Sequence, residues 1–64
     1  MVIPEEAVRR LTAAGLFVEH EEHIGIIHVR RKPNSMPMRI FARKGFYSEA
    51  AVDRVINRFR KEEK

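Results

Sequence analysis

The amino-acid sequence predicts a small α+β domain in the order helix, strand, strand, strand, helix. Apolar residues recur at helical spacing near both ends of the chain, and β-branched residues are concentrated in its centre. Turn-forming residues separate these segments. The 64 residues suffice for one domain with a thin core. We therefore expect residues 1–64 to form one α-β-β-β-α domain, with two helices packed on one face of a three-stranded antiparallel sheet.

The first helix is expected over residues 4–14. Pro4 suits the first turn because its missing amide hydrogen needs no partner there. Glu5 and Glu6 would lie at the positive end of the helix dipole, and Gly15 is typical of a left-handed helix end. The apolar stripe of this helix consists of Ala7, Val8, Leu11 and Ala14.

Three strands are expected over residues 16–20, 24–31 and 38–43. Residues 21–23 would connect the first two strands, and Lys32-Pro33-Asn34-Ser35 is a stronger turn signal before the third. Pro37 is expected at the beginning or edge of the third strand, because proline cannot donate a ladder hydrogen bond. The single Gly25 predicts a bulge or a close backbone approach.

The second helix is expected over residues 48–61, with Ser48 as its N-cap. Tyr47 and Val52 have the spacing of a hydrophobic staple across the start of this helix. Its amphipathic stripe consists of Val52, Val55, Ile56 and Phe59.

Successive side chains of a strand point to opposite faces, so the strand sequences also predict which side chains share a face. Ile27 and Val29 form one apolar set, and Met38, Ile40 and Ala42 form another. If both sets face the helices, the opposite face of the sheet is open to solvent. This open face would carry His28, Arg30, Arg39, Phe41 and Arg43.

Positive charge is unevenly distributed along the chain. The net charge is +4, from 13 basic and 9 acidic residues. Residues 1–29 contain two basic and five acidic residues, whereas the segment from Arg30 to Lys44 contains six basic residues and no acidic one. Such asymmetry favours a polyanionic partner, although it can also serve solubility alone.

We expect this basic face to bind nucleic acid, and DNA in preference to RNA. Guanidinium groups pair with phosphates and guanine edges, and an aromatic ring can stack on a base or pack on a sugar. The predicted contacts to phosphates or bases are Arg30, Arg39 and Arg43, with Phe41 packing against base or sugar. Arg31, Lys32 and Lys44 would add electrostatic steering at the strand ends. Alternatively, Phe41 is covered by a dimer partner or turns into the core.

Other functions remain open on the same residues. One is a protein-interaction module, such as a homodimeric regulator of a host or phage protein. Another is a small ribonuclease toxin with His28 as general base. The histidines and glutamates of residues 19–28 are explained by a polar turn, so no metal or other cofactor is expected. The absence of cysteine indicates a reducing compartment, and with no apparent leader or membrane span we expect a cytoplasmic protein.

Two family resemblances accompany these patterns. The segment Arg43-Lys44-Gly45-Phe46-Tyr47-Ser48-Glu49-Ala50-Ala51 resembles the strand-to-helix junction of the N-terminal DNA-binding domains of phage and transposon integrases. In that family a three-stranded sheet followed by one helix enters the major groove, so the resemblance implies a DNA partner. It covers the chain from Leu16 onward and does not include the first helix.

The second resemblance is to double-stranded-RNA-binding domains and to HicA-type toxins that cleave mRNA. The α-β-β-β-α order is similar to both, and Leu11-Thr12-Ala13-Ala14-Gly15-Leu16 resembles the opening of the toxins. The Gly-Ser-His motif of the toxins is absent. The basic cluster that opens the second helix of the RNA-binding domains is also absent, since Ser48-Glu49-Ala50 stands there. No catalytic residue is therefore carried over to this chain.

Overall fold

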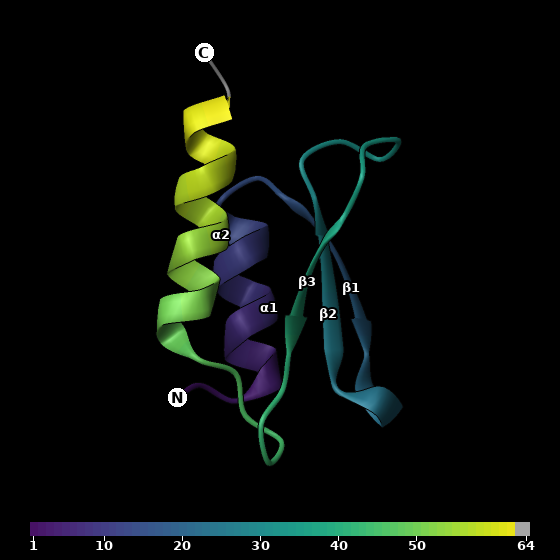
Figure 1. Ribbon diagram of the computed structural model, residues 1–64, viewed down its shortest axis with the longest axis vertical. Coiled ribbons are helices and arrows are strands. Elements are labelled where there is room, and N and C mark those ends of the chain that lie inside the picture. The colour runs from purple at the N-terminus through teal and green to yellow at the C-terminus, as the bar shows by residue number, and fades with distance from the viewer. Residues whose placement is uncertain (63–64) are drawn as a thin grey trace.

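The computed structural model describes residues 1–62, with side chains through residue 60. Helix α1 spans Pro4–Ala13, strand β1 Phe17–Glu21 and the 3-10 turn η1 Glu22–Ile24. Strand β2 spans Ile26–Arg30, strand β3 Met38–Phe41 and helix α2 Glu49–Glu62 (Figure 1). The predicted α-β-β-β-α order and α+β class are thereby confirmed.

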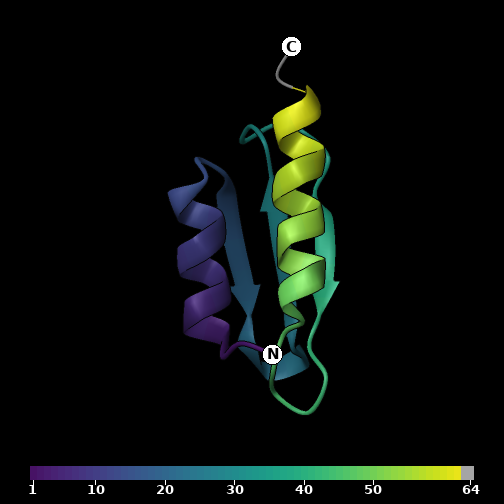
Figure 2. The ribbon, with the colours of Figure 1, turned by 90° about the vertical axis from the view of Figure 1, so that its left-hand side faces the viewer.

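The molecule has two layers. The strands form one antiparallel sheet in the order β1-β2-β3. Both helices lie on the same side of this sheet, α1 against β1 and α2 against β3 (Figure 1). Figure 2 shows the two helices side by side in front of the strands. The opposite face of the sheet is not covered by any part of the chain that the structure describes.

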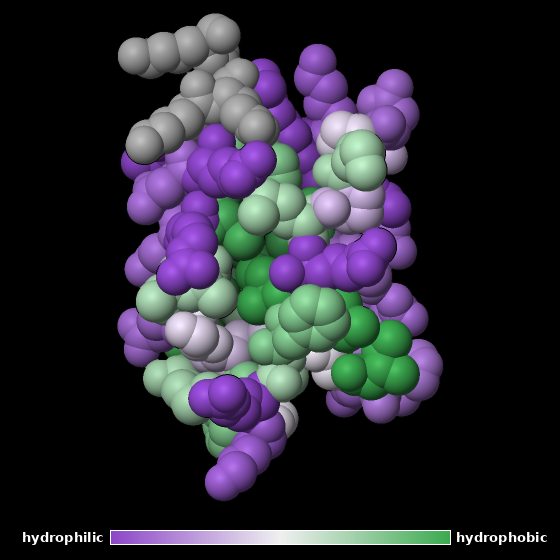
Figure 3. All heavy atoms as spheres, viewed as in Figure 1, coloured by the Kyte–Doolittle hydropathy of each residue, from purple (hydrophilic) through white to green (hydrophobic). Residues whose placement is uncertain are grey.

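The core lies between the helices and the sheet. Ile27 and Val29 of β2 are fully buried, and Ile40 of β3 is nearly so, which confirms that the apolar sets face the helices. In Figure 3, hydrophobic side chains gather along the seam between α2 and β3, with hydrophilic ones on both flanks. The remaining buried core residues are Val2, Ala7, Leu11, Leu16, Tyr47, Val52, Val55 and Phe59.

The helix predictions differ from the structure by one residue. Helix α1 ends at Ala13, so Ala14 is its exposed C-cap and not a member of the apolar stripe. Gly15 follows with a φ of +83°, which returns the chain toward the sheet. At the start of α2, the Ala51 amide donates to the Ser48 side-chain oxygen at 3.3 Å, which confirms the predicted N-cap.

The second strand begins two residues later than predicted, because η1 and Gly25 occupy the connection. Gly25 has a left-handed φ of +68°, and its carbonyl accepts a hydrogen bond from the Ala42 amide at 2.7 Å. A Cβ at Gly25 would lie 3.2 Å from the Ala42 Cβ. The close backbone approach predicted for Gly25 is therefore present, although Gly25 precedes the strand and does not lie within it.

The third strand ends two residues earlier than predicted, because the chain turns back on itself. Arg43 and Phe46 exchange two backbone hydrogen bonds of 2.8 and 3.1 Å. Lys44 and Gly45 between them both have positive φ, at +54° and +84°, as a type I′ hairpin turn requires. We call residues 43–46 the tip hairpin. It projects from the end of β3 (Figure 1), and Lys44 is one of its two central residues.

The N-terminal segment holds the tip hairpin and α2 in place. Val2 and Tyr47 exchange backbone hydrogen bonds of 2.8 and 2.9 Å, and both side chains are buried. The start of the chain is therefore paired with the residue that connects the tip hairpin to α2. This pairing positions Arg43 and Lys44 relative to the sheet.

Candidate nucleic-acid interface

The pairing register determines which side chains share the uncovered face of the sheet. Glu19 of β1 lies beside His28 of β2, which in turn lies beside Arg39 of β3. Toward the tip hairpin, Ile26 lies between its partners Glu21 and Phe41. The open face is thus formed by Phe17, Glu19, Glu21, Ile26, His28, Arg30, Arg39 and Phe41.

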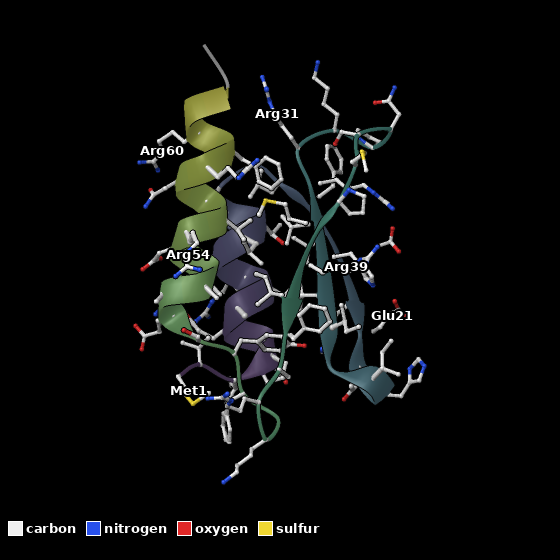
Figure 4. The ribbon with its side chains drawn as sticks, viewed as in Figure 1. Met1, Glu21, Arg31, Arg39, Arg54 and Arg60 are labelled. Carbon is white, nitrogen blue, oxygen red and sulfur yellow. The ribbon has the colours of Figure 1, made fainter. Side chains whose placement is uncertain are left out.

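Phe41 points to solvent on this face, as predicted. Its exposed fraction is 65%, and Arg39 and Arg43 on either side of it are also exposed. Neither arginine forms an ion pair with any residue described in the structure. Figure 4 shows Arg39 extending away from the two helices. Phe41 therefore neither joins the core nor lies beneath another part of the described chain.

Arg43 and Lys44 extend the row of cations beyond the end of β3. The tip hairpin holds both residues, and Phe46, which pairs with Arg43, is 43% exposed beside them. A strand advances about 3.4 Å per residue, so Arg39 and Arg43 lie about 14 Å apart along the chain. We call Arg39, Phe41, Arg43 and Lys44 the β3 track.

The β1 side of the open face is acidic. The Glu19 carboxylate accepts a hydrogen bond from Arg30 Nη1 at 2.9 Å, and Glu21 Oε1 pairs with His28 Nε2. The open face therefore also carries carboxylates of β1, to which the sequence analysis had assigned no face. Arg30 lies on the face as predicted, but its guanidinium already faces a carboxylate. On this face, the arginine that has no ion-pair partner among the described residues is Arg39 on β3.

Arg31 and Lys32 lie away from the β3 track, at the opposite end of the strands. They contribute to a groove of about 420 Å³ between the β2–β3 loop and the second half of α2. Figure 4 shows Arg31 at the end of the sheet nearest the last turns of α2. The groove is completed by Ser35, Met36, Pro37, Met38, Arg58 and Phe59. The six predicted cations are thus divided among three places. Arg39, Arg43 and Lys44 belong to the β3 track, Arg30 pairs with Glu19, and Arg31 and Lys32 line the groove.

His28, the residue considered as general base of a ribonuclease, is engaged in a local contact, as are the polar side chains of Ser35 and His20. The His28 side chain is only 18% exposed and is held by Glu21. Ser35 donates to the Lys32 carbonyl at 2.9 Å and accepts from the Lys32 amide at 3.1 Å, which makes it part of the loop structure. His20 faces the helices, with its ring 6.1 Å from that of Tyr47. Among the described residues, no group of acidic residues and histidines is arranged to hold a metal ion.

Three members of the open face, all on β1, were missed in the sequence because faces were assigned only to the second and third strands. Extending the same alternation to β1 places Phe17, Glu19 and Glu21 together on one side. Phe46 carries no comparable pattern, because its exposure depends on the tip hairpin. The two glutamates that the sequence analysis did not place on this face are important because they pair with Arg30 and His28 and so neutralise the charge on its central strand.

Comparison of the chain with protein-family models, with curated protein sequences and with solved structures found no match. Neither helix in the described part of the chain is both long enough and apolar enough to cross a membrane.

Proposed function

We propose that the protein binds nucleic acid along the β3 track. The observation that carries this proposal is a phenylalanine that is 65% exposed between two exposed arginines, neither of which pairs with a carboxylate among the described residues. An aromatic ring gains free energy when it is removed from water, and a nucleic-acid base offers a flat surface for it. Flanking guanidinium groups supply the charge that the phosphates require.

The surrounding residues support this assignment. Lys44, at a central position of the tip hairpin, adds a third cation next to Arg43 in the chain, and Phe46 adds exposed apolar surface in the same hairpin. Arg31 and Lys32 provide positive potential at the far end of the strands, where they would steer an anionic ligand during approach. DNA is proposed in preference to RNA because residues 43–51 resemble the integrase junction; this resemblance bears on DNA against RNA, and not on whether the DNA is single- or double-stranded.

The test is the salt dependence of binding. Short labelled DNA and RNA oligonucleotides are titrated with protein at several salt concentrations, and fluorescence anisotropy reports the affinity. Each phosphate contact contributes about 0.7 to the logarithmic salt slope for single strands and about 0.9 for duplex DNA. Arg39→Ala with Arg43→Ala should therefore lower the slope by about 1.4 to 1.8 and weaken binding to all sequences.

Arg54→Ala with Arg9→Ala is the matched control. Both arginines are exposed and lie on the helices, so this variant removes the same charge away from the open face. It should change the slope much less. If wild type does not bind any oligonucleotide at low salt, the proposal is refuted, and equal effects of the two double variants would mean that the β3 track is not the site.

A homodimer is the second candidate, because β3 has an unpaired outer edge. The Ala42 amide donates to Gly25, so even-numbered residues of β3 direct their backbone groups toward β2. The backbone groups of Arg39 and Phe41 then point outward, without a strand partner among the described residues. Antiparallel pairing of two copies along this edge would form one continuous six-stranded sheet. Multi-angle light scattering tests this candidate, and the mass of a single 7.5 kDa chain would exclude it.

A further inference from the structure

We infer that the nucleic acid bound along the β3 track is a single strand. This inference rests on the proposed function and concerns which form of nucleic acid the surface accepts. It follows from the distribution of charge across the three strands. Carboxylates occupy the β1 edge of the open face, and the cations at the β3 edge have no carboxylate partner in the part of the chain that the structure describes.

A duplex meets the wrong charge on one side of this face. The major groove of B-form DNA is about 12 Å wide and has a phosphate backbone on each wall. Neighbouring strands lie about 4.8 Å apart, so the three strands are about 10 Å across and their two edges face the two walls. Glu19 and Glu21 have side chains that are 67% and 43% exposed. Glu19 pairs with Arg30 and Glu21 with His28, so β1 presents carboxylates and no lysine or arginine of its own to the phosphates of the second wall, and this opposes binding.

A single strand avoids this conflict because it has one backbone. Its phosphates can follow Arg39, Arg43 and Lys44, while a base stacks on Phe41. The remaining bases are directed across the sheet toward β1 and meet no second row of phosphates. The charge gradient of the open face therefore matches a ligand with one anionic side.

The β1 side also suits bases. A glutamate carboxylate accepts a hydrogen bond from the amino group of cytosine, so Glu19 and Glu21 can face bases where they would repel phosphates. Phe17 on the same strand is 51% exposed and provides a second aromatic surface for stacking. Both aromatic rings lie on the open face, one on each edge strand.

The experiment compares one labelled DNA oligonucleotide, free and annealed to its complement, with the full-length protein. Wild type should bind the single strand more tightly than the duplex at the same salt concentration. Stacking of one base contributes about 1–3 kcal/mol, so Phe41→Ala should weaken single-strand binding about 5- to 150-fold. Phe41→Tyr keeps the ring and should retain the affinity. Because residue 41 is exposed, neither variant disturbs the core.

A second variant tests the role of the carboxylates directly. Glu19→Gln with Glu21→Gln removes two negative charges from β1 and should raise duplex affinity more than single-strand affinity. The inference is overturned if wild type binds the duplex as tightly as the single strand, if Phe41→Ala keeps full single-strand affinity, or if the two glutamine substitutions affect both ligands equally. In each case the proposed function stands as long as Arg39→Ala with Arg43→Ala weakens binding, whereas the absence of all binding refutes both.

Discussion

The tip hairpin offers a substitution that should change stability and binding in opposite directions. Lys44 has a φ of +54° at a central position of a type I′ turn. The left-handed region costs an ordinary side chain about 1–2 kcal/mol, and asparagine tolerates it better because its short polar side chain bonds locally. Asn-Gly is also the preferred pair for this turn. Lys44→Asn should therefore stabilise the fold by about 0.5–1 kcal/mol while removing one cation from the β3 track.

Urea denaturation followed by circular dichroism measures the stability. The transition midpoint should rise with an unchanged slope, since the surface exposed on unfolding stays the same. In a domain of this size, 1 kcal/mol corresponds to about 4–8 °C in melting temperature. In the same variant, the salt slope for single-strand binding should fall by about 0.7, the contribution of one phosphate contact.

Lys32→Asn is the control for Lys44→Asn. Lys32 is an exposed loop lysine whose φ is not positive, so the same change of residue removes the same charge without relieving strain. Its stability should stay within about 0.5 kcal/mol of wild type. Equal stabilities of the two variants would refute the argument from the left-handed turn. If Lys44→Asn is stabilised but its affinity and salt slope are unchanged, Lys44 does not contact the nucleic acid.

Two further predictions concern the scaffold. The hydroxyl of Tyr47 is buried without a hydrogen-bond partner among the described residues, and burial raises the pKa of this group above its ordinary value of 10.0. Because the fold favours the neutral phenol, stability should be complete below about pH 10 and fall as the pH rises through the raised pKa. Tyr47→Phe should remove this alkaline loss and add up to about 1 kcal/mol near neutral pH, as seen by urea denaturation; a variant with the same alkaline loss would contradict the assignment. Gly25→Ala should destabilise the fold more than Gly15→Ala does, because both have positive φ but only Gly25 brings the new Cβ to 3.2 Å from Ala42; equal melting temperatures would show that this contact has no effect.

The sequence was sufficient for the order of the elements and for the two faces of β2 and β3. Side-chain direction in a strand has a period of two. The apolar side chains of β2 and β3 are buried only if they face the helices, so this requirement determined the face of every other residue in the two strands. This rule placed Phe41 on the face opposite the helices, and the structure shows that it is exposed there. Helix ends were predicted within one residue because Pro4, Gly15 and Ser48 each act locally on the backbone.

The charge balance of the open face was decided only by the tertiary structure. Residues 19 and 30 are far apart in sequence, and their ion pair depends on the register of β1 against β2. That register is set by η1 and the left-handed Gly25, and a shift of one residue would have turned both glutamates toward the helices. The tip hairpin likewise depends on the pairing of Val2 with Tyr47. Local sequence patterns therefore determined the direction of each cation, whereas contacts between distant segments decided which cations were left without a carboxylate.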